Sequence, residues 1–114
     1  MPAKDPLLFV IHIRDCCERI VHYTAGISAG APYEQIVMDA VCRNLQIIGE
    51  AARKVDDLFK QEHPEIPWSS TIGLRNVIVH AYDGVLPEVI QEIVERDIPP
   101  LLQAVRNILQ QTRG

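Results

Sequence analysis

The sequence has few aromatic residues, few cysteines and no long apolar run. Aromatic side chains make up 5% of the 114 residues, and the longest apolar run, residues 7–11, is far too short to cross a bilayer. The three cysteines, Cys16, Cys17 and Cys42, lack CxxC spacing, which favours reduced core thiols over a disulfide framework. The first residues show no signal-peptide pattern either. We therefore expect a cytoplasmic protein with no membrane segment.

An excess of positive charge is also missing. Lysine and arginine number 11 against 15 aspartates and glutamates, which gives a net charge of −4. No global field therefore attracts the protein to nucleic acid, and any polyanion site has to be local. The chain is 47% apolar and 23% charged, a globular balance. Its length fits one domain over residues 1–114.

Strand-like alternation, internal repeats and low-complexity tracts do not occur. Instead, apolar residues recur every three or four positions, the period of an amphipathic helix. This period predicts helices over about 5–24, 33–61 and 68–82 and from residue 87 onward, with a first loop at 24–32. Four helices with short connections predict an all-α fold, an antiparallel four-helix bundle.

Two features of the long helices lead to further predictions. The segment 33–61 has a wide apolar face, so we expect it to lie centrally and to pack against more than one neighbour. Gly49 inside it costs about 1 kcal/mol relative to alanine, which indicates a close helix crossing or the approach of another backbone. Pro99 and Pro100 lie within the last helical segment, so that helix should be kinked or split there.

Four polar side chains gather in the short third segment, which is otherwise apolar: Arg75, Asn76, His80 and Tyr82. Burying all of them without partners would be costly. On a helix, Asn76 and His80 lie one turn apart, and Arg75 and Tyr82 share a face two turns apart. The spacing therefore allows the four side chains to line one cleft.

The pattern Arg75-x4-His80-x-Tyr82 resembles the R-x4-H-x-Y motif of HepT-like toxins in the HEPN superfamily of small helical ribonucleases. The surrounding sequence is similar too, and the resemblance extends over most of the chain. It includes Ile66-Pro67-Trp68 upstream, Gly73-Leu74-Arg75-Asn76 leading into the motif, Asp83-Gly84-Val85 after it, and the stretch Asn44-Leu45-Gln46-Ile47-Ile48-Gly49-Glu50-Ala51.

The resemblance implies a metal-independent endoribonuclease that is the toxin of a type II toxin–antitoxin system. Arg75 and His80 would be catalytic, with Asn76 supporting His80, and no cofactor or metal is implied. The chemistry of the residues agrees with this assignment. RNA supplies its own nucleophile, the 2′-hydroxyl, so cleavage needs a proton acceptor or donor near neutral pH and a cation for the phosphorane. His80 and Arg75 can supply these two functions.

The resemblance also implies partners besides the RNA substrate. Such proteins are homodimers with the motif at the interface, which would double the charge that one subunit offers to RNA. Their cognate antitoxin is a minimal (MntA-like) nucleotidyltransferase that transfers AMP to the motif tyrosine, here Tyr82, as O-AMP-tyrosine. This chain carries no nucleotidyltransferase motif of its own, so it would be the target.

Other interpretations stay open. The bundle could be a catalytically inactive HEPN domain that acts as an interaction or nucleotidyltransferase-partner module, with its motif retained for dimer packing. His12 and Cys16, four residues apart, could form half of a metal site, but no second half is visible and core or surface roles are simpler. Trp68 is most simply a packing anchor, and Glu50 is expected to be exposed.

Overall fold

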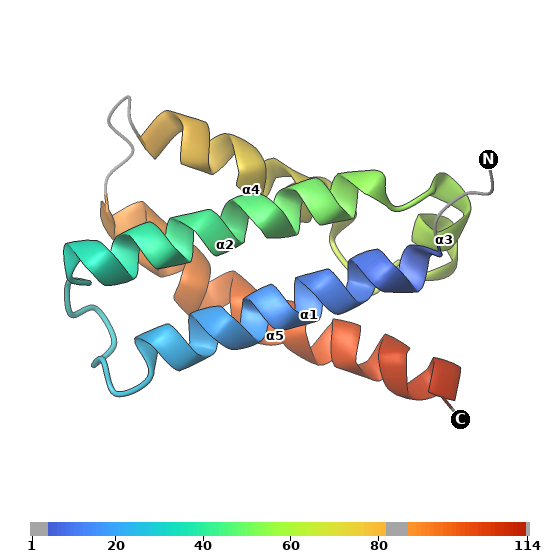
Figure 1. Ribbon diagram of the computed structural model, residues 1–114, viewed down its shortest axis with the longest axis horizontal. Helices are drawn as coiled ribbons and strands as arrows, with labels where there is room; N and C mark the ends of the chain where they lie inside the picture. Colours follow the sequence, from blue (N-terminus) through green and yellow to red (C-terminus); the bar gives the residue numbers. More distant parts are fainter. Residues whose placement is uncertain (1–4, 82–86, 114) are drawn as a thin grey trace.

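The fold is known from a computed structural model, which describes residues 5–81 and 87–113, with backbone alone for 77–81 and 113. Within these ranges the chain forms helices and no strand: α1 (Pro6–Thr24), α2 (Gln35–Lys54), α3 (Asp57–Glu62), α4 (Trp68–Ala81) and α5 (Pro87–Arg113). The long helices run alternately in opposite directions (Figure 1). The expected all-α antiparallel bundle is therefore confirmed.

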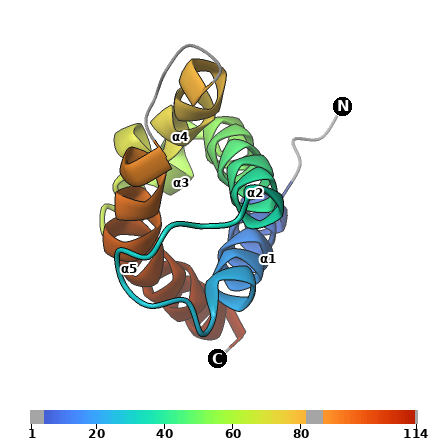
Figure 2. The ribbon, with the colours of Figure 1, turned by 90° about the vertical axis from the view of Figure 1, so that its left-hand side faces the viewer.

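The helix α2 occupies the central place that its apolar breadth predicts. It packs against α1 on one side and α4 on the other, while α1 also packs against α5. The view along the bundle shows α1, α2, α4 and α5 around a common interior (Figure 2). That interior is filled by side chains that are fully shielded from solvent, among them Val10, Ile13, Ile20, Val41, Leu45, Ile48, Ile90, Val105 and Ile108.

The prediction of one continuous helix over 33–61 is wrong near its end, where the helix is interrupted at residues 55–56. The helix α2 ends at Lys54, Val55 is extended, and Asp56 caps the separate short helix α3 by accepting a hydrogen bond from Phe59 N at 2.8 Å. The cap satisfies a backbone donor that would otherwise lack a partner. Because Val55 is buried and Phe59 packs against the core, the apolar period continues across the break and hides it.

The first loop joins α1 to α2 and is fastened to α5. Gly26 and Gly30 have φ of +82° and +80°, which L side chains rarely adopt. Gln91, buried on α5, donates to Ala31 O at 2.6 Å and accepts from Tyr33 N at 3.4 Å. Gly30 N donates to Glu95 at 3.0 Å. Two side chains of α5 therefore hold a loop whose own backbone hydrogen bonds are limited to turns, such as that from Ala31 N to Ser28 O at 2.9 Å.

The remaining helix predictions agree with the structure. The helix α1 starts where Asp5 accepts a hydrogen bond from Leu7 N, and α4 covers residues 68–81 of the predicted 68–82. Pro99 and Pro100 lie inside α5, whose ribbon changes direction about half-way along (Figure 1). Proline has no N–H to donate to the preceding turn, so a bend is expected near the two prolines, although α5 continues through both of them as one helix.

The cysteines Cys16, Cys17 and Cys42 are all free. Cys16 and Cys17 are buried on the inner face of α1, and Cys42 is partly buried on α2. Within the described residues, no helix has the combination of length and apolar character needed to span a membrane.

Candidate active site

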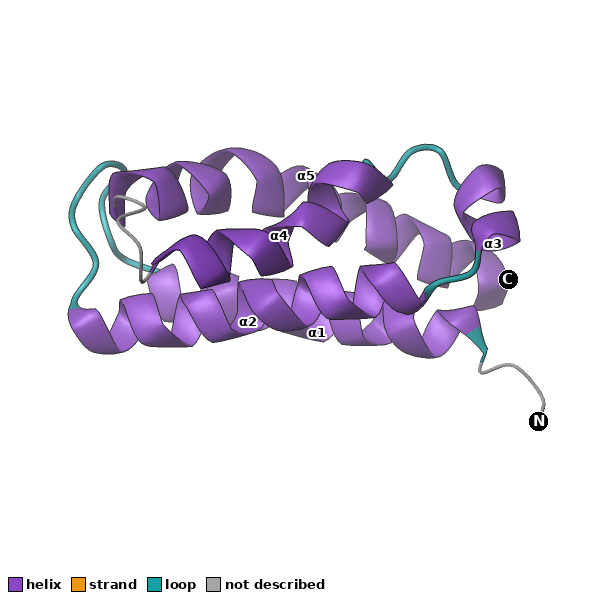
Figure 3. Cartoon of the chain, turned by 90° about the horizontal axis from the view of Figure 1, so that it is seen from above, coloured by secondary structure: helices purple, strands orange, loops and turns teal. Residues whose placement is uncertain are grey.

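The site predicted from sequence lies on α4, and an aromatic cluster fixes the start of this helix. Trp68 donates from its indole Nε1 to His63 O at 2.9 Å. Its ring meets Phe59 edge-on with the centroids 6.3 Å apart, and Phe59 lies 4.3 Å from the His63 ring. Trp68 is therefore the packing anchor that the sequence predicts. Figure 3 shows α4 running back from this end of the bundle, near α3.

The described side chains of α4 divide into a buried and an accessible set. Thr71 and Leu74 are buried, and Ile72 packs against the core. Arg75 is half-buried and Asn76 is exposed. The first two turns of α4 thus pack against the bundle, and the predicted site begins after them, at Arg75.

Gly49 of α2 lies at the point where α2 and α4 cross. An ideal Cβ built on Gly49 would lie 2.6 Å from Arg75 N, 2.9 Å from Arg75 Cβ and 2.9 Å from Ile72 O. All three distances are shorter than van der Waals contact. The expectation of a close approach at Gly49 is therefore confirmed, and the backbone that approaches is that of α4 at Arg75.

The described arginines fall into two groups by their ionic contacts, and Arg75 belongs, with Arg19, Arg43 and Arg53, to the group without a carboxylate partner among the described residues. Arg14, Arg96 and Arg106 each lie within 4 Å of a carboxylate. Among the residues that the structure describes, no carboxylate lies within that distance of the Arg75 guanidinium. Its charge is therefore not neutralised by any described side chain and can attract an anion.

The structure brings together only part of the predicted site. Arg75 and Asn76 are adjacent on α4, and His80 is on the same helix, so the predicted one-turn spacing between Asn76 and His80 is present in the backbone. The His80 side chain, Tyr82 and the turn at Asp83 and Gly84 lie outside the described residues. Whether the four side chains line one cleft stays a prediction.

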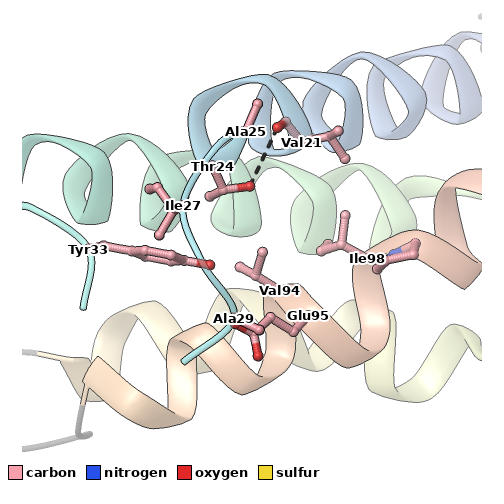
Figure 4. A pocket seen from close by; sticks show the side chains of 10 residues that line it. Val21, Thr24, Ala25, Ile27, Ala29, Tyr33, Val94, Glu95 and Ile98 are labelled. Carbon is pink, nitrogen blue, oxygen red and sulfur yellow. Dashed lines mark hydrogen bonds between the residues drawn. The ribbon is translucent and has the colours of Figure 1, made fainter. Parts of the chain in front are cut away.

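A surface pocket lies elsewhere, between α1, the first loop and α5 (Figure 4). Its wall is mainly apolar, and the Tyr33 phenol points into it from the loop. The residues that line it include Val21, Thr24, Ile27, Tyr33, Val94, Glu95 and Ile98. Burial, and then the nearby Glu95 carboxylate, raise the pKa of Tyr33. The pocket contains no residue of α4, so it is not part of the predicted site.

The other polar residues noted in the sequence lie on α1 and α2. His12 is exposed on α1 while Cys16 is buried, and the described residues contain no group of three metal-ligating side chains. Glu50 is exposed as predicted and accepts a long hydrogen bond from Gln46 at 3.5 Å.

Comparison with known proteins tests the family resemblance of the whole chain. The model of the family described as "Ribonuclease HepT-like" matches residues 13–108. The chain belongs to the HepT-like ribonuclease family. This match confirms the resemblance that the sequence carries, and it extends from within α1 to near the end of α5.

Relatives with similar names cover most or part of the chain. "Putative RNase TTE0752" of Caldanaerobacter subterraneus subsp. tengcongensis is 34% identical over 96% of this chain and 99% of its own length. "Putative RNase MJ1380" of Methanocaldococcus jannaschii is 30% identical over 92% of this chain and 97% of its own length. "Probable ribonuclease HepT" of Thermococcus cleftensis is 47% identical over 54% of this chain and 56% of its own length. No solved structure is significantly similar to this chain.

Sequence reasoning selected Gly49 but did not find its partner. The glycine in a long helix signals a close approach, yet nothing in the sequence tells which backbone approaches. The antiparallel pairing of α2 with α4 supplies that information, and it connects Gly49 to a motif residue 26 positions later in the sequence.

Proposed function

We propose that the protein is a metal-independent endoribonuclease and the toxin of a type II toxin–antitoxin pair. The observation that carries the proposal is membership of the HepT-like ribonuclease family, together with the motif on α4. There Arg75 has no ionic partner among the described residues, and His80 follows it on the same helix.

The proposed reaction uses the nucleophile that RNA carries. The 2′-oxygen loses its proton and attacks the adjacent phosphorus, and the bond to the leaving 5′-oxygen breaks as that oxygen gains a proton. His80 exchanges a proton with the 2′-hydroxyl or with the leaving 5′-oxygen. The products are a 2′,3′-cyclic phosphate and a 5′-hydroxyl end. Arg75 binds the non-bridging phosphate oxygens and stabilises the charge that grows on them. Asn76, one turn before His80, orients the imidazole.

Removal of the His80 side chain tests the catalytic assignment. His80→Ala should abolish RNA cleavage and growth inhibition while the helical signal in circular dichroism is retained. His22→Ala is the matched control, because His22 is an exposed histidine in the last turn of α1, and it should cleave like the wild type. Cleavage should persist in EDTA. Full cleavage by a folded, nuclease-free His80→Ala protein would refute the catalytic role of His80, whereas a folded wild type that does not cleave RNA would favour the alternative, an inactive HEPN interaction module.

We also propose that the active form is a homodimer in which two α4 helices face one groove. One subunit offers a single Arg75 and a single His80 on a chain of net charge −4, so pairing would concentrate the cations that RNA needs. Light scattering should give about twice the chain mass of 12.8 kDa. A monomer at micromolar concentration that still cuts RNA would refute the shared groove.

The third part of the proposal makes Tyr82 the point of control. A minimal nucleotidyltransferase would transfer AMP from ATP to the phenol oxygen and release pyrophosphate, and the new phosphate would compete with RNA for Arg75. Co-expression with a cognate minimal nucleotidyltransferase should add AMP to the peptide that contains Tyr82. Tyr82→Phe should prevent the addition, whereas Tyr23→Phe, at a partly exposed tyrosine of α1, should not. Neutralised toxicity without modification would instead indicate inhibition by binding.

A further inference from the structure

The crossing of α2 and α4 joins a glycine to a residue of the proposed site. Gly49 is buried, and the space that a Cβ would need is filled by Arg75 N, Arg75 Cβ and Ile72 O. Two of these three atoms belong to the backbone of α4. A backbone atom cannot rotate away as the end of a flexible side chain can, so any side chain at position 49 must displace the α4 backbone at Ile72 and Arg75.

The size of that movement follows from the contact distances. Non-bonded heavy atoms in ordinary contact lie roughly 3.5 Å or more apart, whereas the Cβ position is 2.6 Å from Arg75 N. The two helices would have to separate by roughly 1 Å. Because the contact is made at Arg75 itself, the Cα and Cβ atoms from which its guanidinium extends would take up the whole displacement.

We propose that Gly49 is a positioning residue for Arg75, and that the missing side chain sets the place where the guanidinium meets the scissile phosphate. The inference rests on the proposed function, since it takes Arg75 as the phosphate-binding group. Gly49 touches no substrate and acts through α4. A shift of about 1 Å in a catalytic group can cost on the order of 100-fold in rate, so the effect should appear in the chemical step.

A double-mutant cycle separates positioning from general destabilisation. We expect Gly49→Ala to lower kcat by about 10- to 100-fold, with a smaller change in KM, because Arg75 stabilises charge that grows in the transition state. In the Arg75→Ala background the same substitution should cost nothing further, because its effect passes through the missing guanidinium. Equal losses in both backgrounds would overturn the proposal.

Gly73→Ala is the matched control. Gly73 lies on α4 two residues before Arg75, and a Cβ there meets nothing within 4 Å. Alanine improves helix propensity equally at both positions, so a loss of kcat confined to Gly49→Ala isolates the crossing. If Gly49→Ala needs support to fold, all variants are assayed in trimethylamine N-oxide, which favours the folded state. A Gly49→Ala chain that stays unfolded there contradicts the proposal, which requires a shifted α4 on an intact bundle.

A structural measurement keeps this inference separate from the proposed function. In the folded Gly49→Ala protein, the NMR signals of the Arg75 backbone amide and side-chain Nε–H should shift, while those of α1 stay in place. A wild-type protein that does not cleave RNA refutes the proposed function, yet the NMR test still reports on the crossing. Conversely, if the wild type cleaves RNA but Gly49→Ala changes neither the Arg75 signals nor kcat, the positioning role alone is refuted.

Discussion

The bundle body and α4 are held in place by different means. The helix α1 buries five side chains, Val10, Ile13, Cys16, Cys17 and Ile20, whereas the described part of α4 buries Thr71 and Leu74. The described part of α4 is also held by the aromatic anchor at Trp68 and by the backbone crossing at Gly49. The body thus depends mainly on side-chain volume, whereas α4 adds local contacts to its buried side chains and leaves Asn76 exposed and Arg75 half-buried. Stability and activity should therefore respond to substitutions in different regions.

The largest change in stability is expected from the body. Leu45 is fully buried on α2, so Leu45→Ala leaves a cavity and should lower the free energy of unfolding by about 2–5 kcal/mol. Leu58→Ala is the matched control, because Leu58 on α3 is 66% exposed, and it should change stability by less than about 0.5 kcal/mol. Urea unfolding followed by circular dichroism measures both.

The same variant sharpens the comparison when cleavage is assayed. Under conditions where Leu45→Ala is folded, its RNA cleavage per folded molecule should stay close to that of the wild type, because the substitution removes volume from the core and introduces no clash at the crossing of Gly49 and Arg75, one turn further along α2. A loss of activity well beyond the loss of folded protein would show that the body and α4 are more tightly coupled than their contacts indicate.

Sequence periodicity predicts the body better than the site, for a physical reason. The stripe of α1 reports burial directly, and burial determines which residues form the core. Periodicity does not reveal the break after Lys54, because Val55 and Phe59 continue the apolar spacing of the helix across it. Arg75, Asn76, His80 and Tyr82 are visible in the sequence as a motif, but the contact between Gly49 and Arg75 depends on how α2 and α4 cross. A one-dimensional pattern does not contain that distance.

A pH-dependent loss of stability should also come from the body. Burial, and then the neighbouring Cys16 and Glu18, raise the pKa of Cys17 from the ordinary 9.0 to about 12. Above pH 9 the thiol ionises in the unfolded chain but stays protonated in the folded one. The unfolded state then binds fewer protons, so stability is intact below pH 9 and falls as pH rises toward 12, by about 1.4 kcal/mol per unit at most.

Urea unfolding in a reducing buffer between pH 8 and roughly pH 10.5 measures this slope. Cys17→Val keeps a small apolar side chain in the core and should flatten the alkaline loss relative to the wild type at each pH. Equal slopes for the two proteins would mean that other groups dominate the alkaline titration. The activity of the folded protein should not depend on this substitution, since Cys17 lies on α1.

A smaller effect is expected at the anchor of α4. Trp68→Phe retains an aromatic ring against Phe59 but removes the indole donor to His63 O. That carbonyl still accepts from Ile66 N at 3.3 Å, so it is not left without a partner. The loss should be about 1 kcal/mol, the net value of one hydrogen bond. A loss several times larger in thermal unfolding would show that the indole ring is packed more tightly than its half-buried state indicates.

The smallest effect is expected on the outer face of α5. Arg96 pairs with Glu92 at 2.9 Å and with the adjacent Asp97 at 3.1 Å, but its side chain is 64% exposed. Water and salt screen such pairs, and holding a long side chain in one geometry costs entropy. Arg96→Ala should therefore leave the melting temperature unchanged within error, at low and at high salt. A clear drop in the melting temperature that disappears with added salt would show that exposed ion pairs on α5 stabilise the bundle body. The body would then be held by local contacts as well as by side-chain volume.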